Sequence, residues 1–574
     1  MTLSDSSAAV NALADRFWEA TLEQHPTTAT IYGDDRWDDR LDDPSAAGRA
    51  AARALREATL AELAAIPTDG LPVEERITHD MLQVVCELGS EADDLQMDLV
   101  EMVDQINGPQ SLLPQGVQFQ PADTPGRLEK LLARLAAFEP FVGAHLDLLE
   151  EARTSGMTAP RIVAERTISQ AERLLAIPVD QSPIVVGARL AEGDDAGRAR
   201  VATVVRDVVN PALGRYVEAL RGPYFAATRE EPGLWSAPDG AARYRMAIRT
   251  WTSLDLDPAE IHQIGLDELA ALDADRLAIA RAAGFDSIAA YRAHLAADPA
   301  NQAPTKEDLV ARAQEDITRA LAVAPRWFGR LPLATCDVRP VEPFMERDAP
   351  PAFYYPPTVD GSRPGVYFVN TYDLPTRLIS KLATTTYHEA IPGHHFQIAL
   401  EMEHPGLPAF RRLGSRMLGS AYAEGWGLYS ERLADEMGLY RNDAERFGML
   451  EGQAWRAVRL IVDTGIHALG KGRAWAVDLL QEGAGLSATD AGIETDRYIV
   501  WPGQALTYKI GHREINRLRL ELAARDGAAF DIRAFHDALL GHGSLALATL
   551  ARELPGWVAP AGWGSGGARE LVAP

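Results

Sequence analysis

Helix-forming sequence runs through most of this chain and sets the class of fold that it can adopt. Alanine, leucine, arginine and glutamate dominate long stretches in which apolar residues recur at the spacing of one helix face. The clearest stretches are residues 45–66, 125–153, 197–220, 257–283 and 305–323. Ser45 and the pair Asp257-Pro258 are typical helix-start residues, and Pro140 predicts a break within the second stretch. We therefore predict a mainly α fold.

One segment interrupts the helical pattern. Residues Phe344–Thr376 contain several prolines and aromatic residues, and the run Gly365–Val369 has the composition of a strand. We expect a small β-strand or hairpin element here. Helical sequence returns from Leu378, so this element directly precedes the helix that carries the most informative motif of the chain.

Composition excludes several classes of protein. The chain has 574 residues and a formal net charge of −26, whereas a nucleic-acid binder normally presents a basic face. Its two cysteines, Cys86 and Cys336, are too few for a disulfide framework or a cysteine zinc site. No apolar run approaches the roughly 18 residues of a membrane-spanning helix. Residues Met1–Asn11 lack the pattern of a signal peptide, so we expect a cytoplasmic protein with no membrane partner.

Three of the 13 histidines lie within eight residues, in the sequence Tyr-His-Glu-Ala-Ile-Pro-Gly-His-His that starts at Tyr387. The familiar zinc signature, His-Glu-x-x-His, places two histidines on one helix face and a glutamate beside the metal. Here Pro392 stands where the second histidine would be, and the next histidines are His394 and His395. On an undisturbed helix His394 would lie about 9 Å along the axis from His388, too far for one zinc ion.

The pair Pro392-Gly393 offers a way to shorten this distance. Proline cannot donate a hydrogen bond to the carbonyl of His388, and glycine tolerates unusual backbone angles. A two-residue bulge in the helix would bring His394 back to His388 as the second ligand. His395 would then point toward the substrate or a supporting partner. The residues alone leave His395 open as the alternative ligand.

A catalytic zinc site takes three protein ligands and leaves one position open for water. We predict Glu424 as the third ligand, because a helix that follows about thirty residues later can run antiparallel to the first. Gly425 and Gly427 are poor helix formers, which indicates that the backbone beside Glu424 approaches another group closely. Glu431, seven residues later, is the competing choice.

Four segments together resemble the bacterial family catalogued as domain of unknown function 885: His388–Gln397, Ala423–Trp426, Val462–His467 and Tyr498–Gly511. The resemblance extends from Phe17 to Leu518. That family is similar to carboxypeptidase Taq and, more distantly, to angiotensin-converting enzyme and dipeptidyl peptidase III. The resemblance implies one large helical, zinc-peptidase-like unit over residues 1–574. It further implies a deep cleft between an N-terminal helical half, about residues 1–250, and a metal-binding half, about residues 251–574.

The resemblance also implies roles for single residues. Zinc is expected to be held by His388, His394 and Glu424, with Glu389 as the general base. The pairing of Gly393 with His394 matches the relatives, whereas the two extra residues inside the motif depart from their pattern. We accordingly expect a zinc-dependent hydrolase of peptide or related amide bonds in small substrates, in which Glu389 activates a metal-bound water to attack the carbonyl.

Amide hydrolysis develops negative charge on the carbonyl oxygen, and two residues are candidates to stabilise it. Tyr508 follows a Pro-Gly turn that starts a helix, and its hydroxyl can donate a hydrogen bond. His467 follows Asp463 by four residues, so the two side chains can pair on one helix face. We therefore assign Glu389, Tyr508 and His467 as the candidate catalytic residues.

Other polar residues are candidates to contact a substrate. A free substrate carboxylate would suit an arginine or lysine, and the sequence does not decide among Arg497, Arg377 and Lys509. Asn370, in the strand-like segment, is placed to bond the backbone of a peptide that adds to a strand edge.

Two alternatives to this interpretation stay open. The chain could be a non-catalytic helical peptide-binding protein or a biosynthetic partner that retains the peptidase scaffold, although such a protein would not need Glu389. Imidazole and carboxylate ligands also suit iron or manganese. The expected partner is a small peptide or amide substrate, and the sequence allows a homodimer without requiring one.

Overall fold

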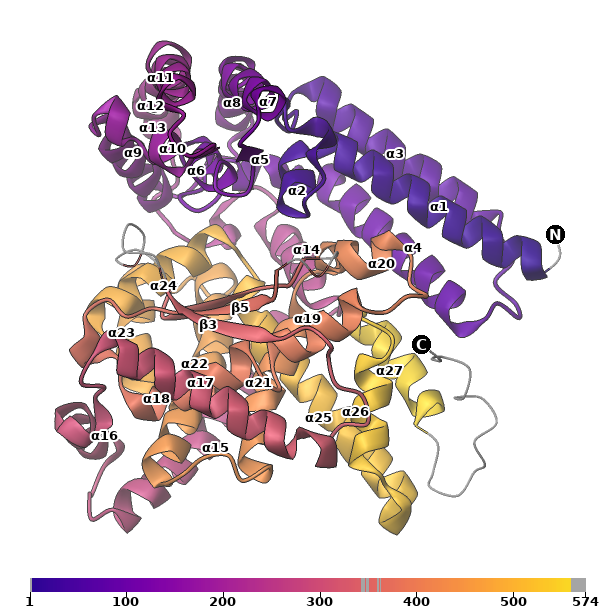
Figure 1. Cartoon of the computed structure of the whole chain (residues 1–574), viewed down its shortest axis with the longest axis vertical. Coiled ribbons are helices and arrows are strands. Elements are labelled where there is room, and N and C mark those ends of the chain that lie inside the picture. Colours follow the sequence, from indigo (N-terminus) through magenta and orange to yellow (C-terminus); the bar gives the residue numbers. More distant parts are fainter. Residues whose placement is uncertain (1–2, 342–345, 347–349, 359–360, 362, 559–574) are drawn as a thin grey trace.

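The computed structural model describes residues 3–341, 346, 350–358, 361 and 363–558, and the statements below refer to these residues. The described chain is mainly α-helical, as predicted (Figure 1). No helix in it is both long and apolar enough to cross a membrane.

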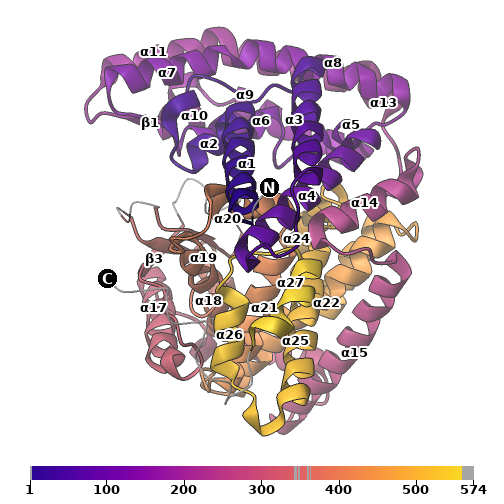
Figure 2. The ribbon, with the colours of Figure 1, turned by 90° about the vertical axis from the view of Figure 1, so that its right-hand side faces the viewer.

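The first part of the chain forms a layer of helices that covers one side of the molecule (Figures 1 and 2). Its helices are α1 (Leu3–Gln24), α2 (Pro26–Ile31), α3 (Ala46–Ala64), α4 (Val73–Asp94), α5 (Met97–Glu101), α6 (Pro109–Gly116), α7 (Pro125–Ala136), α8 (Phe138–Ser155), α9 (Arg161–Leu175), α10 (Pro183–Gly187), α11 (Asp195–Val204), α12 (Asn210–Ala219) and α13 (Phe225–Ala227). The short strands β1 (Pro121–Ala122) and β2 (Arg189–Leu190) pair in parallel within this layer.

The second part contains the helices that surround the histidine motif. They are α14 (Gly240–Thr252), α15 (Pro258–Ala282), α16 (Ile288–Ala297), α17 (Lys306–Val323), α18 (Ile379–Glu389), α19 (His394–Met402), α20 (Ala409–Leu413), α21 (Ala421–Glu436), α22 (Asp443–His467), α23 (Arg473–Ala484), α24 (Ala488–Val500), α25 (Thr507–Asp526), α26 (Ile532–Leu540) and α27 (Leu547–Trp557). Helix α21 packs closely on α25 and also contacts α18, while α22 packs on α15 and α18.

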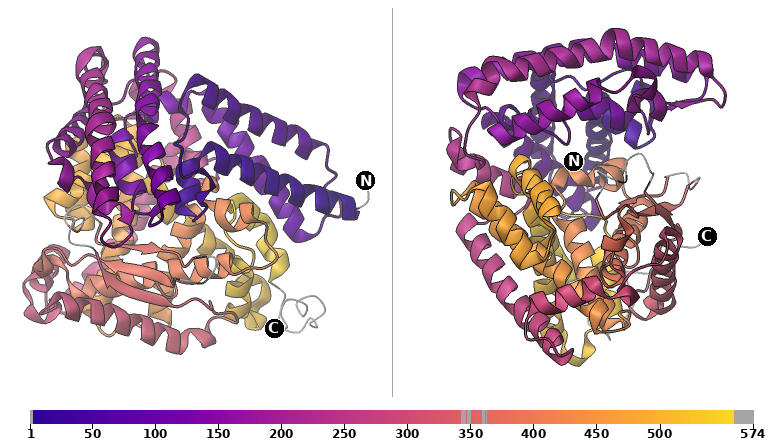
Figure 3. Two further views of the ribbon diagram at one scale, coloured as in Figure 1. Left: turned by 45° about the horizontal axis from the view of Figure 1, so that its top comes forward. Right: turned by 90° about the vertical axis from the view of Figure 1, so that its left-hand side faces the viewer.

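The β element is a three-stranded sheet rather than a hairpin. Its strands are β3 (Cys336–Pro340), β4 (Ala352–Tyr355) and β5 (Gly365–Val369), in the order β3-β5-β4. The central strand β5 pairs in parallel with β3 and antiparallel with β4, and its bounds are those predicted from the sequence. The sheet lies between the N-terminal layer and helices α17 and α18 (Figures 1 and 3). Part of the predicted segment, residues 344–345, 347–349, 359–360 and 362, lies outside the described residues.

Local sequence signals locate the ends of several predicted helices. The side chains of Ser45, Asp257 and Thr305 accept hydrogen bonds from the first-turn amides of α3, α15 and α17, as N-cap residues do. The predicted break near Pro140 falls slightly earlier, at Ala137. Pro140 instead lies in the first turn of α8, where a missing N–H leaves no helical hydrogen bond unmade.

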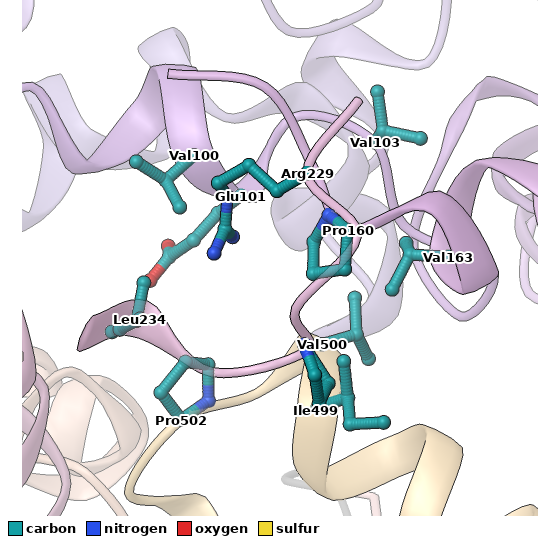
Figure 4. Close-up of a pocket in the computed structure, with 11 residues that line it drawn as sticks. Val100, Glu101, Val103, Pro160, Val163, Arg229, Leu234, Ile499, Val500 and Pro502 are labelled. Carbon is teal, nitrogen blue, oxygen red and sulfur yellow. The ribbon is translucent and has the colours of Figure 1, made fainter. Parts of the chain in front are cut away.

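Most buried apolar side chains of both parts form one continuous cluster that extends from Val10 to Val558, and a second, small cluster contains Ala280, Tyr291, Leu295 and Phe447. Where the N-terminal layer meets α24, a cavity of about 10 Å³ remains, which is room for about one water molecule. Figure 4 shows the side chains of Glu101 and Arg229 among the apolar residues that line it.

The division of the chain near residue 250 and the deep cleft between two halves stay predictions.

We predict that Gly511→Ala destabilises the protein by about 1–3 kcal/mol, because a Cβ there would lie 1.9 Å from the carbonyl oxygen of Ala421 and force α25 away from α21. Gly214→Ala in α12 is the matched control. A Cβ at Gly214 meets nothing within 4 Å, so this change should be neutral or stabilise by about 0.4–1 kcal/mol. Urea unfolding monitored by circular dichroism measures the stability of both variants. Equal unfolding midpoints for the two variants would contradict the close approach of α25 to α21.

Candidate metal centre

The histidine motif spans two helices instead of one bulged helix, so the expected bulge is wrong in form. Helix α18 ends at Glu389, the backbone leaves the helical region at Ala390 (φ −110°, ψ −100°), and α19 begins at His394. A Cβ at Gly393 would lie 1.9 Å from the carbonyl oxygen of His388. Only glycine allows this approach, which brings His394 back to His388 as the sequence required.

Helix α21 supplies the hydrogen bonds that the break between α18 and α19 needs. The indole Nε1 of Trp426 donates to the carbonyl oxygens of Pro392, at 2.9 Å, and Gly393, at 3.2 Å. The hydroxyl of Ser430 donates to the carbonyl oxygen of Pro392 at 3.3 Å. These donors satisfy the carbonyl group of Pro392, which the interrupted helix leaves without an amide partner, and add a second donor to the carbonyl of Gly393, which already accepts from the amide of Gln397.

The break places three predicted ligands around one point. Nε2 of His388 and Nε2 of His394 each lie 3.4 Å from Oε2 of Glu424. One donor atom from each of the three residues lies within 4.8 Å of the other two. The two imidazole rings are nearly perpendicular, with centroids 4.7 Å apart. His388 is buried, while the side chains of His394 and Glu424 keep 12% and 19% of their surface exposed, so the group opens to solvent on one side.

Gly427 explains why α21 can approach the first histidine. A Cβ at this position would lie 2.8–2.9 Å from Cε1 and Nε2 of the His388 ring. Gly425 serves the opposite contact, because a Cβ there would lie 2.5 Å from the backbone of Gly511 on α25. The prediction that the backbone beside Glu424 approaches other groups closely is therefore confirmed.

Glu431 is a partner of His388 and not a member of the three-residue group. Its Oε1 lies 2.9 Å from Nδ1 of His388, on the opposite side of the ring from Glu424. Burial lowers the pKa of His388, but the neighbouring carboxylates of Glu424 and Glu431 outweigh burial and raise the pKa to about 9. Burial raises the pKa of Glu424, but His388 and His394 hold that pKa well below its usual range. The carboxylates of the site thus favour positive charge on the neighbouring histidines.

His395 points away from this group, toward the sheet. Its Nδ1 lies 2.9 Å from the hydroxyl of Tyr354 on β4, and its Nε2 lies 3.0 Å from the carbonyl oxygen of Ala334. Burial lowers the pKa of His395 to about 4, so the ring is neutral. Both ring nitrogens have partners, and His395 therefore attaches α19 to the β element.

Two of the three predicted catalytic residues lie beside the three-residue group. Glu389 follows His388 directly and is half-buried, and within the described residues no hydrogen bond or ion pair is formed by its carboxylate. The ring of Tyr508 is nearly parallel to the His388 ring, with centroids 6.3 Å apart. The guanidinium of Arg459 lies 4.2 Å from the centre of the Tyr508 ring and supports it through a cation–π contact.

The predicted pairing of Asp463 with His467 is wrong. Asp463 accepts hydrogen bonds from the hydroxyl of Tyr244, at 2.6 Å, and from the amide of Gly503, at 3.1 Å. Nδ1 of His467 accepts from the amide of Leu234, and its Nε2 donates to the carbonyl oxygen of Tyr498. Burial lowers the pKa of His467 to about 4. Because backbone groups occupy both nitrogens, His467 has no donor left for a substrate and holds the turn before Tyr508.

The candidate substrate contacts have structural partners as well. Arg497 pairs with Glu494 at 2.8 Å and donates to Gln504, and Arg377 donates to the carbonyl oxygen of Tyr372. Asn370 donates to the carbonyl oxygens of Glu346 and Pro350, and it follows the central strand β5 instead of an edge strand.

Lys509 is also unsuited to bind a substrate carboxylate. Its side chain is 1% exposed, and Nζ donates to Oε1 of Gln453 at 3.1 Å. Burial lowers the pKa of Lys509 to about 8. The sequence offered no sign of these partners, because Gln453 lies 56 residues before Lys509.

Sequence reasoning missed the roles of Trp426 and Glu431. A signal for Glu431 was present, since residues seven apart lie on the same helix face and Glu424 was already assigned to the site. Trp426 gave no comparable signal, because the carbonyl groups to which its indole donates lie in the break between α18 and α19.

Residues 26–554 match the model of a family described as bacterial protein of unknown function, DUF885. No curated protein matches the chain. A crystal structure described as that of a "putative lipoprotein" from Colwellia psychrerythraea is 28% identical, covers 96% of this chain and 99% of its own, and has a TM-score of 0.90. A "putative lipoprotein of unknown function" from Shewanella oneidensis is 19% identical, covers the same shares of the two chains, and has a TM-score of 0.70. The second likeness is one of fold alone.

We predict that His394→Ala weakens zinc binding strongly, because the change removes a donor atom. The loss should exceed the roughly 10–100-fold that follows when only a hydrogen-bond partner of a ligand is removed. His395→Ala is the matched control and should retain the affinity, since His395 contacts Tyr354 and Ala334. Competition with a chromogenic chelator measures both variants. If His395→Ala loses zinc and His394→Ala retains it, the assignment of the second histidine is reversed.

Proposed function

Because the chain belongs to a bacterial family of unknown function, DUF885, we propose its activity from the site itself: a zinc-dependent hydrolase of peptide or related amide bonds in small substrates. The observation that carries the proposal is the convergence of His388, His394 and Glu424 with Glu389 beside them. The restriction to small substrates rests on analogy with helical zinc peptidases.

The spacing of the donor atoms supports a zinc ion. In a tetrahedral zinc site with metal–ligand distances of about 2.0–2.2 Å, neighbouring donor atoms lie about 3.4 Å apart. Oε2 of Glu424 lies 3.4 Å from both imidazole nitrogens, is itself buried and has no hydrogen-bond partner in the described chain. Two histidines and one carboxylate leave a fourth position open, as catalytic zinc sites do.

Zinc in this position would polarise a substrate carbonyl and lower the pKa of a bound water to about 7. The residues of the chain then perform the remaining steps. The Glu389 carboxylate, which has no hydrogen-bond or ion-pair partner among the described residues, accepts a proton from the attacking water and returns it to the leaving amine. The Tyr508 hydroxyl donates a hydrogen bond to the carbonyl oxygen as negative charge develops there.

Metal analysis by mass spectrometry, followed by digestion of a mixed peptide library, tests the proposal directly. We expect one zinc ion per chain and cleavage products that disappear on treatment with a chelator and return with zinc. Protein that contains no stoichiometric transition metal and gains no activity from added zinc would overturn the proposal. Protein that binds zinc and peptides without cleaving them would instead be a binding protein.

We predict that Glu389→Gln retains zinc and the fold but loses nearly all turnover. The two side chains have the same shape, but an amide cannot accept the proton of the attacking water. Glu260→Gln, an exposed glutamate in the first turn of α15, is the control and should leave turnover unchanged. Turnover is measured on a peptide identified from the library, and a near-native rate for Glu389→Gln would remove Glu389 as the base.

We predict that Tyr508→Phe lowers kcat by about 10²–10³ with little change in KM or zinc content, as loss of one oxyanion donor does in other hydrolases. Phenylalanine preserves the ring contacts with His388 and Arg459, so the variant should fold. Tyr291→Phe in α16, outside the site, controls for loss of a tyrosine hydroxyl. Steady-state kinetics distinguish the two, and an unchanged kcat would reduce Tyr508 to a packing residue.

A further inference from the structure

A chain of buried polar contacts extends from His388 to the far side of α25. Glu431, whose Oε1 contacts Nδ1 of His388, accepts a hydrogen bond from Nε2 of Gln453 on its other oxygen at 3.2 Å. Oε1 of Gln453 in turn accepts from Nζ of Lys509 at 3.1 Å. Nζ of Lys509 also lies 3.5 Å from Glu268 on α15. Five helices therefore contribute one residue each to a single line of contacts.

The chemistry of these groups allows the line only one arrangement. A lysine ammonium has donors and no acceptor, so it must face the oxygen of the Gln453 amide. The amide nitrogen is then directed to two acceptors, Oε2 of Glu431 and the carbonyl oxygen of Leu428 at 3.1 Å. The reverse orientation would place nitrogen against nitrogen at one end and oxygen against two oxygens at the other. Lys509 thus fixes the direction in which Gln453 donates.

Burial makes each link of this line energetically important. Glu431 and Gln453 are 1% and 0% exposed, and Lys509 is 1% exposed. A buried carboxylate is stable only with donors around it, so the position of Glu431 depends on its hydrogen-bond partners. Glu431 in turn sets the orientation of the His388 ring, and metal ligands are oriented by such outer-shell partners.

We propose that Gln453 and Lys509 are positioning residues of the metal centre, which hold Glu431 and through it direct Nε2 of His388 at the metal. This inference rests on the proposed zinc site. Neither residue is placed to contact a substrate. Their expected effect is therefore on the affinity of the site for the metal and on the geometry of the metal ligands. Lys509 follows Tyr508 on α25, so one turn of this helix both faces the site and supports it from behind.

Zinc affinity measured by chelator competition tests the proposal on the full-length protein. We expect Lys509→Met and Gln453→Met each to weaken zinc binding by roughly tenfold, the lower end of the range for loss of an outer-shell partner. Because both residues act through one line of contacts, the double variant should bind no more weakly than Gln453→Met alone. Two independent contributions would multiply to about a hundredfold.

Arg513→Met is the matched control. Arg513 lies one turn after Lys509 on the same helix and pairs with the same Glu268, at 2.6 Å, but it is 44% exposed and does not touch Gln453. The Arg513→Met variant should bind zinc with the affinity of the wild type. The visible spectrum of the Co²⁺-loaded protein adds a readout that loss of stability alone does not move. The spectrum should change in the Lys509 and Gln453 variants and stay the same in Arg513→Met.

The outcomes separate the two proposals. Wild-type protein that binds no zinc overturns the proposed function itself. Wild-type protein that binds zinc tightly, with native affinity and an unchanged Co²⁺ spectrum in Lys509→Met, overturns only the positioning role. If Lys509→Met does not fold, Gln453→Met decides the matter, because it removes the link next to Glu431, and native affinity there has the same consequence.

Discussion

The close approach of α21 to helices on two of its sides is the constraint on which the rest of the site depends. Successive helical residues project about 100° apart, so Gly425 and Gly427 face nearly opposite directions. Gly425 lets α21 reach the backbone of Gly511 on α25, and Gly427 lets it reach the ring of His388 on α18. Glu424 and Glu431 lie on the same face as Gly427 and flank that ring. A larger side chain at either glycine would separate the histidines from the carboxylates or move α25 outward.

Such close packing of charged groups requires that their hydrogen bonds be satisfied. His388, Glu431 and Gln453 are almost completely buried, and a buried carboxylate is stable only with donors around it. Nδ1 of His388, Nε2 of Gln453 and, at 3.6 Å, the guanidinium of Arg456 surround Glu431. The exposed part of the site lies on the other side of the His388 ring, at Glu424 and His394. The arrangement therefore has a buried side supported by hydrogen bonds and a side that is open to solvent.

Sequence patterns predicted those features that depend on neighbours in the chain. The caps at Ser45 and Asp257 and the bounds of β5 follow from local chemistry, and the structure confirms them. The convergence of the two histidines on Glu424 was also foreseen, although the chain achieves it by ending one helix and starting another. The pairing of Asp463 with His467 failed because four-residue spacing permits a contact without excluding stronger distant partners. Tyr244 lies 219 residues before Asp463, and no spacing within α22 could indicate it.

The observed partners of Asp463 and His467 nevertheless show how the segments Val462–His467 and Tyr498–Gly511 are connected. Asp463 holds the amide of Gly503, and His467 holds the carbonyl of Tyr498, so the end of α22 fixes both sides of the turn that precedes α25. That turn determines where α25 starts and hence where Tyr508 lies. Tyr508 then faces the ring of His388, Lys509 contacts Gln453, and Gly511 packs on α21. Asp463 and His467, which resemble a catalytic pair in the sequence, thus act on the candidate site at a distance, by setting the start of the helix that carries Tyr508, Lys509 and Gly511.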